Sequence, residues 1–326
     1  MPFGFADDPA SILATLAISS ALKYTFNVVS WLSKKKQYEL VGHITNINSY
    51  PIKACGGIAL KTADATSLGI RVNGFYDRHW LVTKENGDFL TARQYPKLLV
   101  VSTRFTDDQL VITAPGMREL TVPLHPATDR SQVVRCRVWN NHLEGQDCGQ
   151  EASRWFSQYL MVDGIRLLVS TPELMKSQAN SRKNAWGNIA LPGDQGGYQD
   201  ECCGFLIMNQ ASVTELNNHL KKPVTYRNFR PNIVIDGKTA FEEDNWKELL
   251  IGKKVNIRML EPCLRCLVTT VDPEKGVKSE DGEPLKTLST IRCYKKYGKS
   301  PLLGMLATAD EPGRISLGDP VYAIRK

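Results

Sequence analysis

Residues 98–123 have the sequence LLVVSTRFTDDQLVITAPGMRELTVP, and this stretch sets the expected fold class. It contains three short runs rich in Val, Leu, Ile and Thr, at Leu98–Phe105, Gln109–Thr113 and Glu119–Pro123. Asp-Asp and Pro-Gly pairs separate the runs. Such runs bounded by turn-forming residues predict β-strands joined by short connections.

The same pattern continues on both sides of this stretch, and only a few helical patterns interrupt it. Helices are predicted at Glu151–Met161, at Ser212–Leu220 with a capping box from Ser212 to Glu215, and at Asp244–Ile251. Because helices and strands do not alternate regularly, we expect a β-rich α+β fold with barrel-like sheets and no doubly wound parallel sheet. Further strands are predicted at Val133–Trp139, Arg166–Ser170, Phe205–Met208, Asn232–Ile235, Val255–Met259 and Leu267–Val271.

The composition is that of a folded globular protein, with 42% hydrophobic and 23% charged residues among 326. It excludes a largely disordered chain, a coiled coil and a polytopic membrane protein. The net charge of +7 permits an anionic ligand or a membrane surface and does not call for nucleic acid. The polar stretch Ser177–Glu201 is long for a plain connection. The predicted division is therefore residues 1–36, residues 37–172 and residues 173–326.

The N-terminal segment Pro9–Ser33 carries one charge, Lys23, and Lys34 to Lys36 follow it. As a helix it is long enough to cross a bilayer. Its polar residues recur at every fourth position, which is typical of a helix that lies on a membrane. Both interpretations attach the chain to a membrane, with the lysines holding the main body in the cytosol. A helix packed on the protein's own core is the alternative.

The cysteines are the most informative residues. The five histidines lie far apart, and no second pair accompanies Cys263-Leu-Arg-Cys266, so a zinc site is not expected. Neither a glycine-rich nucleotide loop nor a nucleophile elbow occurs. A reactive thiolate beside Arg265 remains, and a thiolate suits a soft metal. From the residues alone, a buried structural pair of cysteines fits equally well.

Three cationic residues stand in conformationally restricted contexts. Lys53 lies in Tyr50-Pro-Ile-Lys-Ala-Cys-Gly-Gly57, where the glycines are expected to let the backbone approach a ligand closely. Arg78 follows Asp77, and Arg230 lies in Asn228-Phe-Arg-Pro-Asn232. Arginines in such settings clamp phosphate or carboxylate groups. An ordinary turn lysine and an arginine paired with a buried carboxylate such as Asp77 remain open.

Taken in order, these motifs resemble the MOSC-domain molybdenum proteins, and among them the mitochondrial amidoxime-reducing components. Thr91-Ala-Arg-Gln94, Tyr297-Gly-Lys-Ser-Pro-Leu302 and Gly318-Asp-Pro-Val-Tyr322 extend the resemblance, which runs from about Gln37 to the C-terminus. It implies an N-terminal MOSC-associated β-barrel-like domain and a C-terminal MOSC β-barrel domain. A membrane-anchor helix would precede them and hold the protein in the mitochondrial outer membrane, with the catalytic part facing the cytosol.

The resemblance implies a molybdenum cofactor, a pyranopterin with a dithiolene and a terminal phosphate. Cys266 matches the protein thiolate that holds the metal, and Cys266 and Asp200 match the catalytic positions. Ala54, Cys202 and Leu306 depart from residues of relatives, which bears on pterin contacts and substrate range. The positions that the resemblance assigns to cofactor binding are Lys53, Ala54, Arg78, Asp200, Glu201, Cys202, Arg230, Asn232, Leu264, Arg265, Cys266 and Leu306.

The activity implied by the resemblance is reduction of N-hydroxylated compounds such as amidoximes, hydroxylamines and N-oxides. Because the sequence has no ferredoxin-type cysteine run and no nicotinamide site, electrons are expected to come from separate proteins. The resemblance implies that these are cytochrome b5 and its NADH-dependent reductase. The alternative is a sulfur-carrier or cofactor-handling protein with a persulfide on Cys266. A noncatalytic membrane-anchored binding module is the third interpretation.

Overall fold

The computed structural model describes Lys23 and residues 37–139, 141–171, 173–174, 177–178, 195–196 and 204–326. Residues Glu39–Lys326 form one compact unit. Apart from Lys23, the predicted anchor Pro9–Ser33 lies outside the described residues, as do Asp200, Glu201 and Cys202. None of the helices described has the length and apolar character that a membrane span requires.

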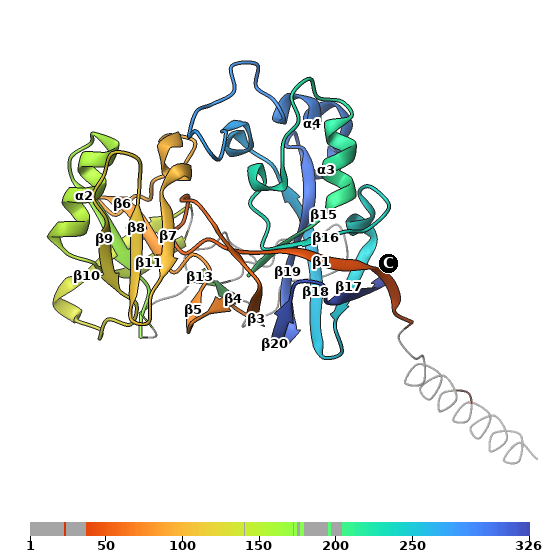
Figure 1. Ribbon diagram of the computed structural model, residues 1–326, viewed down its shortest axis with the longest axis horizontal. Coiled ribbons are helices and arrows are strands. Elements are labelled where there is room, and N and C mark those ends of the chain that lie inside the picture. The colour runs from red at the N-terminus through yellow and green to blue at the C-terminus, as the bar shows by residue number, and fades with distance from the viewer. Residues whose placement is uncertain are drawn as a thin grey trace, which may run out of the picture. The chain divides into compact units, whose positions relative to one another are not determined.

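Seven strands close into a barrel, which Figure 1 shows with β1 crossing the other barrel strands. Strand β1 pairs with β16 on one side and with β21 on the other, and this double pairing closes the ring. All neighbours are antiparallel except β15 and β16. The predicted β-rich fold with a barrel is confirmed. The strands in ring order are β1 (Glu39–Ser49), β16 (Ile233–Ile235), β15 (Phe205–Asn209), β19 (Leu302–Glu311), β18 (Val255–Leu264), β17 (Trp246–Ile251) and β21 (Pro320–Arg325), and β2 (Ile58–Leu60) adds to β1.

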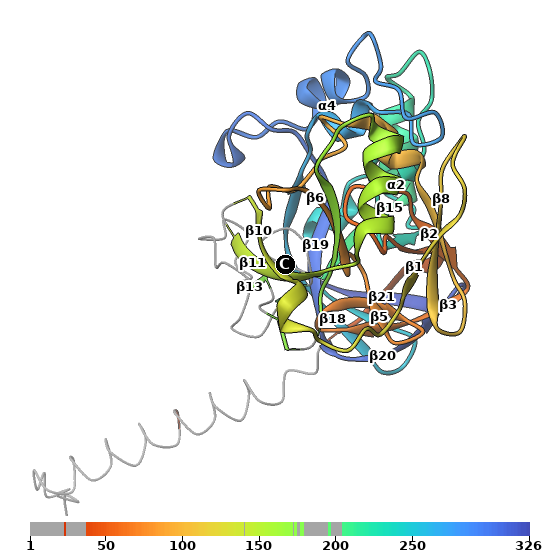
Figure 2. The same cartoon turned by 90° about the vertical axis from the view of Figure 1, so that its left-hand side faces the viewer.

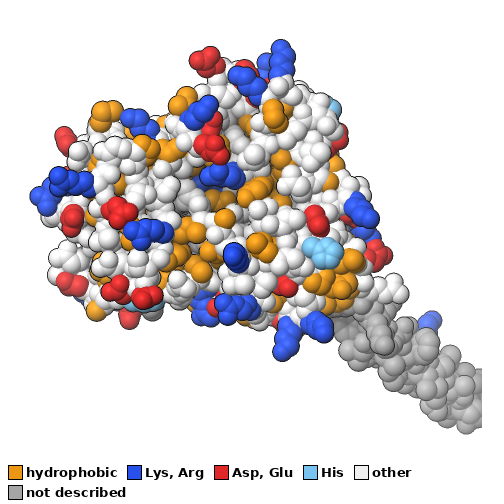
Figure 3. All heavy atoms as spheres, viewed as in Figure 1, with side chains coloured by type: hydrophobic (Ala, Val, Ile, Leu, Met, Phe, Trp, Pro, Cys, Tyr) orange, Lys and Arg blue, Asp and Glu red, His pale blue; other side chains and the backbone are white. Residues whose placement is uncertain are grey.

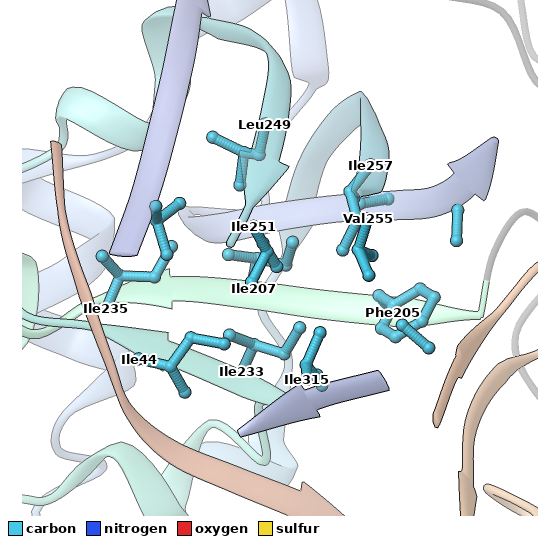
Figure 4. Packing of buried hydrophobic residues seen from close by; sticks show 14 of the residues in the cluster. Ile44, Phe205, Ile207, Ile233, Ile235, Leu249, Ile251, Val255, Ile257 and Ile315 are labelled. Atoms are coloured by element: carbon cyan, nitrogen blue, oxygen red, sulfur yellow. The ribbon is translucent and has the colours of Figure 1, made fainter. Parts of the chain in front are cut away.

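Branched aliphatic side chains fill the barrel. Ile44, Ile207 and Ile233 come from three different strands and point toward one another in Figure 4, and each is at most 2% exposed. This packing holds the strand ends, and the loops that leave them, in fixed positions. Strand β1 belongs to this core although the predicted division groups it with residues 37–172. The boundary near residue 172 stays a prediction.

The segment between β2 and β15 forms smaller antiparallel sheets, one of which also includes β20 from the C-terminal part of the chain. The helix α2 (Gln150–Leu160), which is visible in Figure 2, packs on two of these sheets. The indole of Trp155 is buried on the inner face of α2, and its Nε1 donates to the carbonyl of Arg118 at 2.7 Å. The sheets are β10-β11-β12-β6 (Val133–Val138, Asn141–Asp147, Ile165–Val169, Trp80–Lys84), β7-β8-β9 (Ser102–Phe105, Gln109–Thr113, Leu120–Pro123), β20-β3-β4-β5 (Gly313–Ser316, Thr62–Thr66, Gly69–Val72, Phe75–Tyr76) and β13-β14 (Ser177–Gln178, Gln195–Gly196).

Two predicted elements are wrong, and two others begin differently. The first part of the predicted strand Leu98–Phe105 belongs to a 3-10 helix, Pro96–Val100, and β7 begins at Ser102. The segment predicted as the helix Asp244–Ile251 contains the strand β17, because its backbone pairs with both β18 and β21 inside the barrel. The predicted strand Leu267–Val271 is instead a 3-10 helix, Leu267–Thr270. The hydroxyls of Thr269 and Thr270 donate to the carbonyls three residues earlier and stabilise this turn.

The second predicted helix exists as α3 (Gln210–Asn217), but the predicted capping box does not. The cap is Asn209, whose Oδ1 accepts from the backbone N–H of Ala211 at 3.1 Å. The Ser212 hydroxyl instead donates to Oε2 of Glu243 at 2.7 Å. The remaining described helix is α4 (Leu285–Ile291).

Glu243 makes stability depend on pH. Its side chain is fully buried, and burial, the largest cause, raises the pKa of Glu243 to about 7. The folded protein therefore keeps this proton to a higher pH than the unfolded chain does. The free energy of unfolding is therefore highest below the ordinary carboxyl pKa, where Glu243 is protonated in both the folded and the unfolded state. It falls as the pH rises toward 7, because the unfolded chain loses this proton first.

We expect the urea midpoint of the protein to fall between about pH 5 and about pH 8, and to fall less in the Glu243→Gln variant, which stays neutral. Glutamine keeps an oxygen to accept from Ser212. Urea denaturation followed by circular dichroism at several pH values measures both. An equally steep fall in the variant would show that other groups set the pH dependence.

Candidate functional site

A cavity of about 190 Å³ lies between the barrel and the smaller sheets, and we call it the site cavity. Strands β15, β18 and β19 supply one wall, and the segments around Lys53 and Arg93 supply the other. All nine predicted site residues that the structure describes line it. They are Lys53, Ala54, Arg78, Arg230, Asn232, Leu264, Arg265, Cys266 and Leu306.

The lining of the site cavity is strongly cationic. On the face drawn in Figure 3, blue Lys and Arg side chains are interspersed with red Asp and Glu side chains. By contrast, none of the described residues that line the site cavity is an Asp or Glu. Concentrated positive charge in a concave site attracts anions. Its five cationic side chains belong to Lys53, Arg78, Arg93, Arg230 and Arg265.

A buried carboxylate fixes one of these cations. Asp77 is 0% exposed, and its Oδ2 accepts from the amide of Asn232 at 2.9 Å and pairs with the guanidinium of Arg78. Its Oδ1 accepts from the backbone N–H of Tyr50. The sequence left open whether Arg78 pairs with Asp77 or serves a ligand. The structure shows the pairing, and Arg78 still lines the site cavity.

Tyr50 is a common support for two of the arginines. The Cζ atoms of Arg78 and Arg230 lie 5.0 Å and 4.2 Å from its ring centroid. Burial raises the pKa of Tyr50 to about 12, so the phenol is neutral and donates to the carbonyl of Pro231 at 3.2 Å. A Cβ on Gly57 would lie 2.5 Å from this ring. That glycine therefore admits the tyrosine, and not a ligand as the sequence suggested.

Backbone strain is concentrated in the site cavity. Ala54, Arg78, Trp139 and Arg230 have φ of 69°, 53°, 53° and 59°, in the left-handed region that side chains other than glycine rarely adopt. All four line the site cavity, and they are four of the seven such residues in the described part of the chain. Each such residue costs about 1–3 kcal/mol and persists only where its surroundings enforce it. This clustering marks the site independently of residue chemistry.

Asn232 and Arg265 line the site cavity but use their polar atoms to hold its walls. The Asn232 amide joins Asp77 to the carbonyl of Asn48 at 3.2 Å and accepts from the N–H of Leu206 at 3.0 Å. The Arg265 guanidinium donates to the carbonyls of Leu303 and Phe229, the latter at 2.9 Å. The sequence had placed this guanidinium beside a thiolate. These two contacts instead make Arg265 a support for the loop that carries Cys266.

Cys266 lies where the barrel strand β18 gives way to the 3-10 helix Leu267–Thr270. Its carbonyl accepts from the N–H and the hydroxyl of Thr269, both at 3.0 Å, which fixes the backbone, and its side chain is half-buried. The described residues contain no group of three or more His, Cys, Asp and Glu that could hold a metal ion. Cys263 and Cys266 line the site cavity together with its five cationic side chains, and a soft sulfur donor in such a cavity fits a metal whose other ligands belong to an anionic cofactor.

The site cavity also has lining residues that sequence reasoning did not assign to it, and three of them, Phe89, Arg93 and Trp139, contact one another or Lys53. The Phe89 ring lies 5.7 Å from Nζ of Lys53, and the Trp139 ring packs against both Phe89 and Arg93. Arg93 belongs to the motif Thr91-Ala-Arg-Gln94, which was a usable signal. Phe89 and Trp139 gave none, because aromatic residues near strands are usually core residues.

The chain is similar to known proteins over most of its length. Residues 41–163 match the MOSC N-terminal beta barrel domain, and residues 195–322 match the MOSC domain. The chain is 39% identical over 297 residues to mitochondrial amidoxime reducing component 2 of Bos taurus, covering 89% of this chain and 85% of that one. It is 38% identical over 301 residues to component 1 of Homo sapiens, covering 90% and 87%. Component 1 of Mus musculus is 34% identical over 336 residues, covering 99% and 96%.

Proposed function

Because this chain belongs to the MOSC-domain family of mitochondrial amidoxime-reducing components, we propose that it is a molybdenum-cofactor-dependent reductase of N-hydroxylated compounds. Amidoximes, hydroxylamines and N-oxides are its substrate class. The site cavity carries the proposal, because it combines five cationic side chains with two half-buried cysteines, Cys263 and Cys266. The relatives' names support the reaction class.

Cys266 is the proposed protein ligand of molybdenum, and Lys53, Arg78 and Arg230 are the proposed partners of the cofactor's phosphate and pterin. When bound, the cofactor supplies a two-electron reduction that removes oxygen from the N–O bond, with two protons leaving in water. Ala54, Leu264 and Leu306 line the same cavity. Asp200, Glu201 and Cys202 are proposed to complete the cofactor site, with Asp200 acting in catalysis.

The chain's own contribution is to hold these charges in place before the ligand arrives. Asp77 orients Arg78, Tyr50 supports both Arg78 and Arg230, and Arg230 also donates to the carbonyl of Cys55. Little rearrangement is then needed on binding. Apolar side chains beside them exclude water, which strengthens the electrostatic attraction. They are Phe89, Phe205, Leu206, Phe229, Val268 and Leu306.

The finer parts of the proposal concern partners and location. We propose that electrons reach the site from NADH through cytochrome b5 reductase and cytochrome b5. We also propose that Pro9–Ser33 attaches the protein to the mitochondrial outer membrane, with residues 37–172 and 173–326 facing the cytosol. The names of the relatives support a mitochondrial location. The membrane attachment rests on the low charge of Pro9–Ser33 and on the lysines that follow it.

Metal analysis combined with a reconstituted assay tests the proposal. We expect about one molybdenum per chain and conversion of benzamidoxime to benzamidine that requires NADH, cytochrome b5 and its reductase. Omitting cytochrome b5 will abolish the reaction. Purified protein without molybdenum, even when the cofactor is supplied, would overturn the proposal. Molybdenum without turnover would favour a cofactor-handling protein.

Replacing either Lys53 or Arg230 by alanine should weaken retention of the cofactor. Lys53→Ala and Arg230→Ala each remove a charge-assisted contact to an anionic ligand, which predicts about tenfold weaker retention. Molybdenum per chain after extended dialysis measures the effect, and circular dichroism checks the fold. Lys61→Ala, at an exposed lysine that does not line the site cavity, is the control. Loss of folding in Lys53→Ala or Arg230→Ala would assign a structural role to that residue.

A further inference from the structure

A second cavity, of about 470 Å³, adjoins the site cavity. Phe89, Thr91, Arg93 and Trp139 line both, so the two hollows share a wall. The residues of this wall come from the segment after β6 and from the connection between β10 and β11. The residues that line only the second cavity have no part in the proposed cofactor site, and they are Lys84, Asp88, Gln94 and Arg137.

The shared wall is an ordered stack of an arginine and two aromatic rings. The Trp139 ring packs edge-to-face on Phe89, with centroids 4.9 Å apart and planes at 76°. The Arg93 Cζ lies 4.5 Å from the Trp139 ring on the same wall. Trp139 adopts its left-handed backbone conformation here and stays 37% exposed. A strained, partly exposed tryptophan next to a ligand cavity is a feature of binding sites more than of cores.

The charges of the second cavity favour an anion. Its carboxylate, Asp88, is already compensated, because Nε and Nη2 of Arg137 donate to its Oδ1 at 3.1 Å and 2.9 Å. Arg93 forms no hydrogen bond or ion pair with any residue of the described part of the chain. Lys84 adds a further positive charge. A guanidinium that stacks on an aromatic face keeps its N–H edge for a carboxylate or phosphate.

We propose that the second cavity is a substrate subsite for an anionic group on an aromatic N-hydroxylated compound. Arg93 binds the carboxylate or phosphate of the substrate, and Trp139 covers its ring. The N–O group then lies on the side of Arg93 and Trp139 that faces the site cavity. This inference rests on the proposed function and identifies which members of the substrate class the protein prefers.

Equilibrium binding tests the subsite without catalysis. Calorimetry on the holoprotein compares benzamidine with its meta- and para-carboxy and para-phosphono derivatives. We expect at least one anionic derivative to bind about tenfold more tightly than benzamidine, and Arg93→Gln to remove that difference. The carboxy and phosphono arms show which anion is taken. Arg104→Gln, at an exposed arginine paired with Glu119 outside both cavities, is the matched control.

Steady-state kinetics gives the second readout. Arg93→Gln should raise KM for the preferred anionic benzamidoxime about tenfold more than it raises KM for benzamidoxime, with kcat for the anionic substrate nearly unchanged. Trp139→Ala should raise KM for both substrates, and Trp139→Phe should restore it. Equal effects of Arg93→Gln on neutral and anionic ligands, or loss of molybdenum in this variant, would overturn the subsite and make Arg93 part of the cofactor site.

The two proposals fail in different ways. Selective binding of the anionic derivatives without turnover of any amidoxime would contradict the proposed reductase and leave the subsite supported. Turnover of benzamidoxime without any preference for anionic ligands would contradict the subsite and leave the reductase supported.

Discussion

Replacing Cys266 by serine is expected to lower molybdenum from about one atom per chain to nearly none and to reduce amidoxime turnover by more than about a hundredfold. The described residues that line the site cavity include no His, Asp or Glu to take over as ligand. A serine hydroxyl is a harder and weaker donor than a thiolate for this metal. Elemental analysis of the purified variant, together with the reconstituted assay, measures both effects.

Two other cysteines provide the comparison. Cys293 is exposed and does not line the site cavity, so Cys293→Ser should keep both metal and activity. Cys263 does line the site cavity. Comparing Cys263→Ser with Cys266→Ser shows whether metal binding depends on both cysteines or on Cys266 alone. Full molybdenum content and turnover in Cys266→Ser would refute Cys266 as the ligand.

Asp77→Ala is expected to destabilise the fold by about 3–5 kcal/mol, which is the cost of leaving a buried charge without its partner. The substitution removes the acceptor for the Arg78 guanidinium, the Asn232 amide and the Tyr50 N–H at once. Urea denaturation should show a much lower midpoint. Cofactor retention should fall as well, because Arg78 loses the contact that orients it.

Asp64→Ala is the control for this variant. Asp64 also pairs with an arginine, Arg71 at 3.2 Å, but both side chains are more than 40% exposed. Exposed pairs contribute little to stability, so the midpoint should hardly change. If the two variants lost stability equally, the buried network around Asp77 would not be what holds the site together.

The sequence predicted barrel-like sheets, but it did not predict which strands pair to close the barrel. Short apolar strands between turn residues indicate β-structure locally, and β8 (Gln109–Thr113) matches its predicted limits. The pairing of β1 with β16 joins Ile44 to Ile235, which are far apart along the chain. No local pattern encodes that pairing. The same reason explains the error at β17, where pairing with two neighbours overrides a spacing that also suits a helix.

The sequence predicted those site residues that stand in short, recognisable motifs. Each of Lys53, Arg78, Arg230 and Cys266 stands in a short motif, and the structure brings all four to one cavity. Arg265 shows the limit of that reasoning. Its neighbour in sequence is Cys266, but its guanidinium turns to the carbonyls of Leu303 and Phe229. Adjacency along the chain did not predict the direction of the side chain.

The sequence by itself determined the fold class, the family and the residue types that an anionic, thiolate-held cofactor needs, because these depend on composition and short motifs. Tertiary structure alone decided that Tyr50 supports two arginines, that Asp77 orients Arg78 and that Arg93 and Trp139 separate two cavities. These contacts join segments distant in sequence. Only the closed barrel and the sheets beside it hold them in place, and the strained backbone of Arg78, Arg230 and Trp139 persists because that packing enforces it.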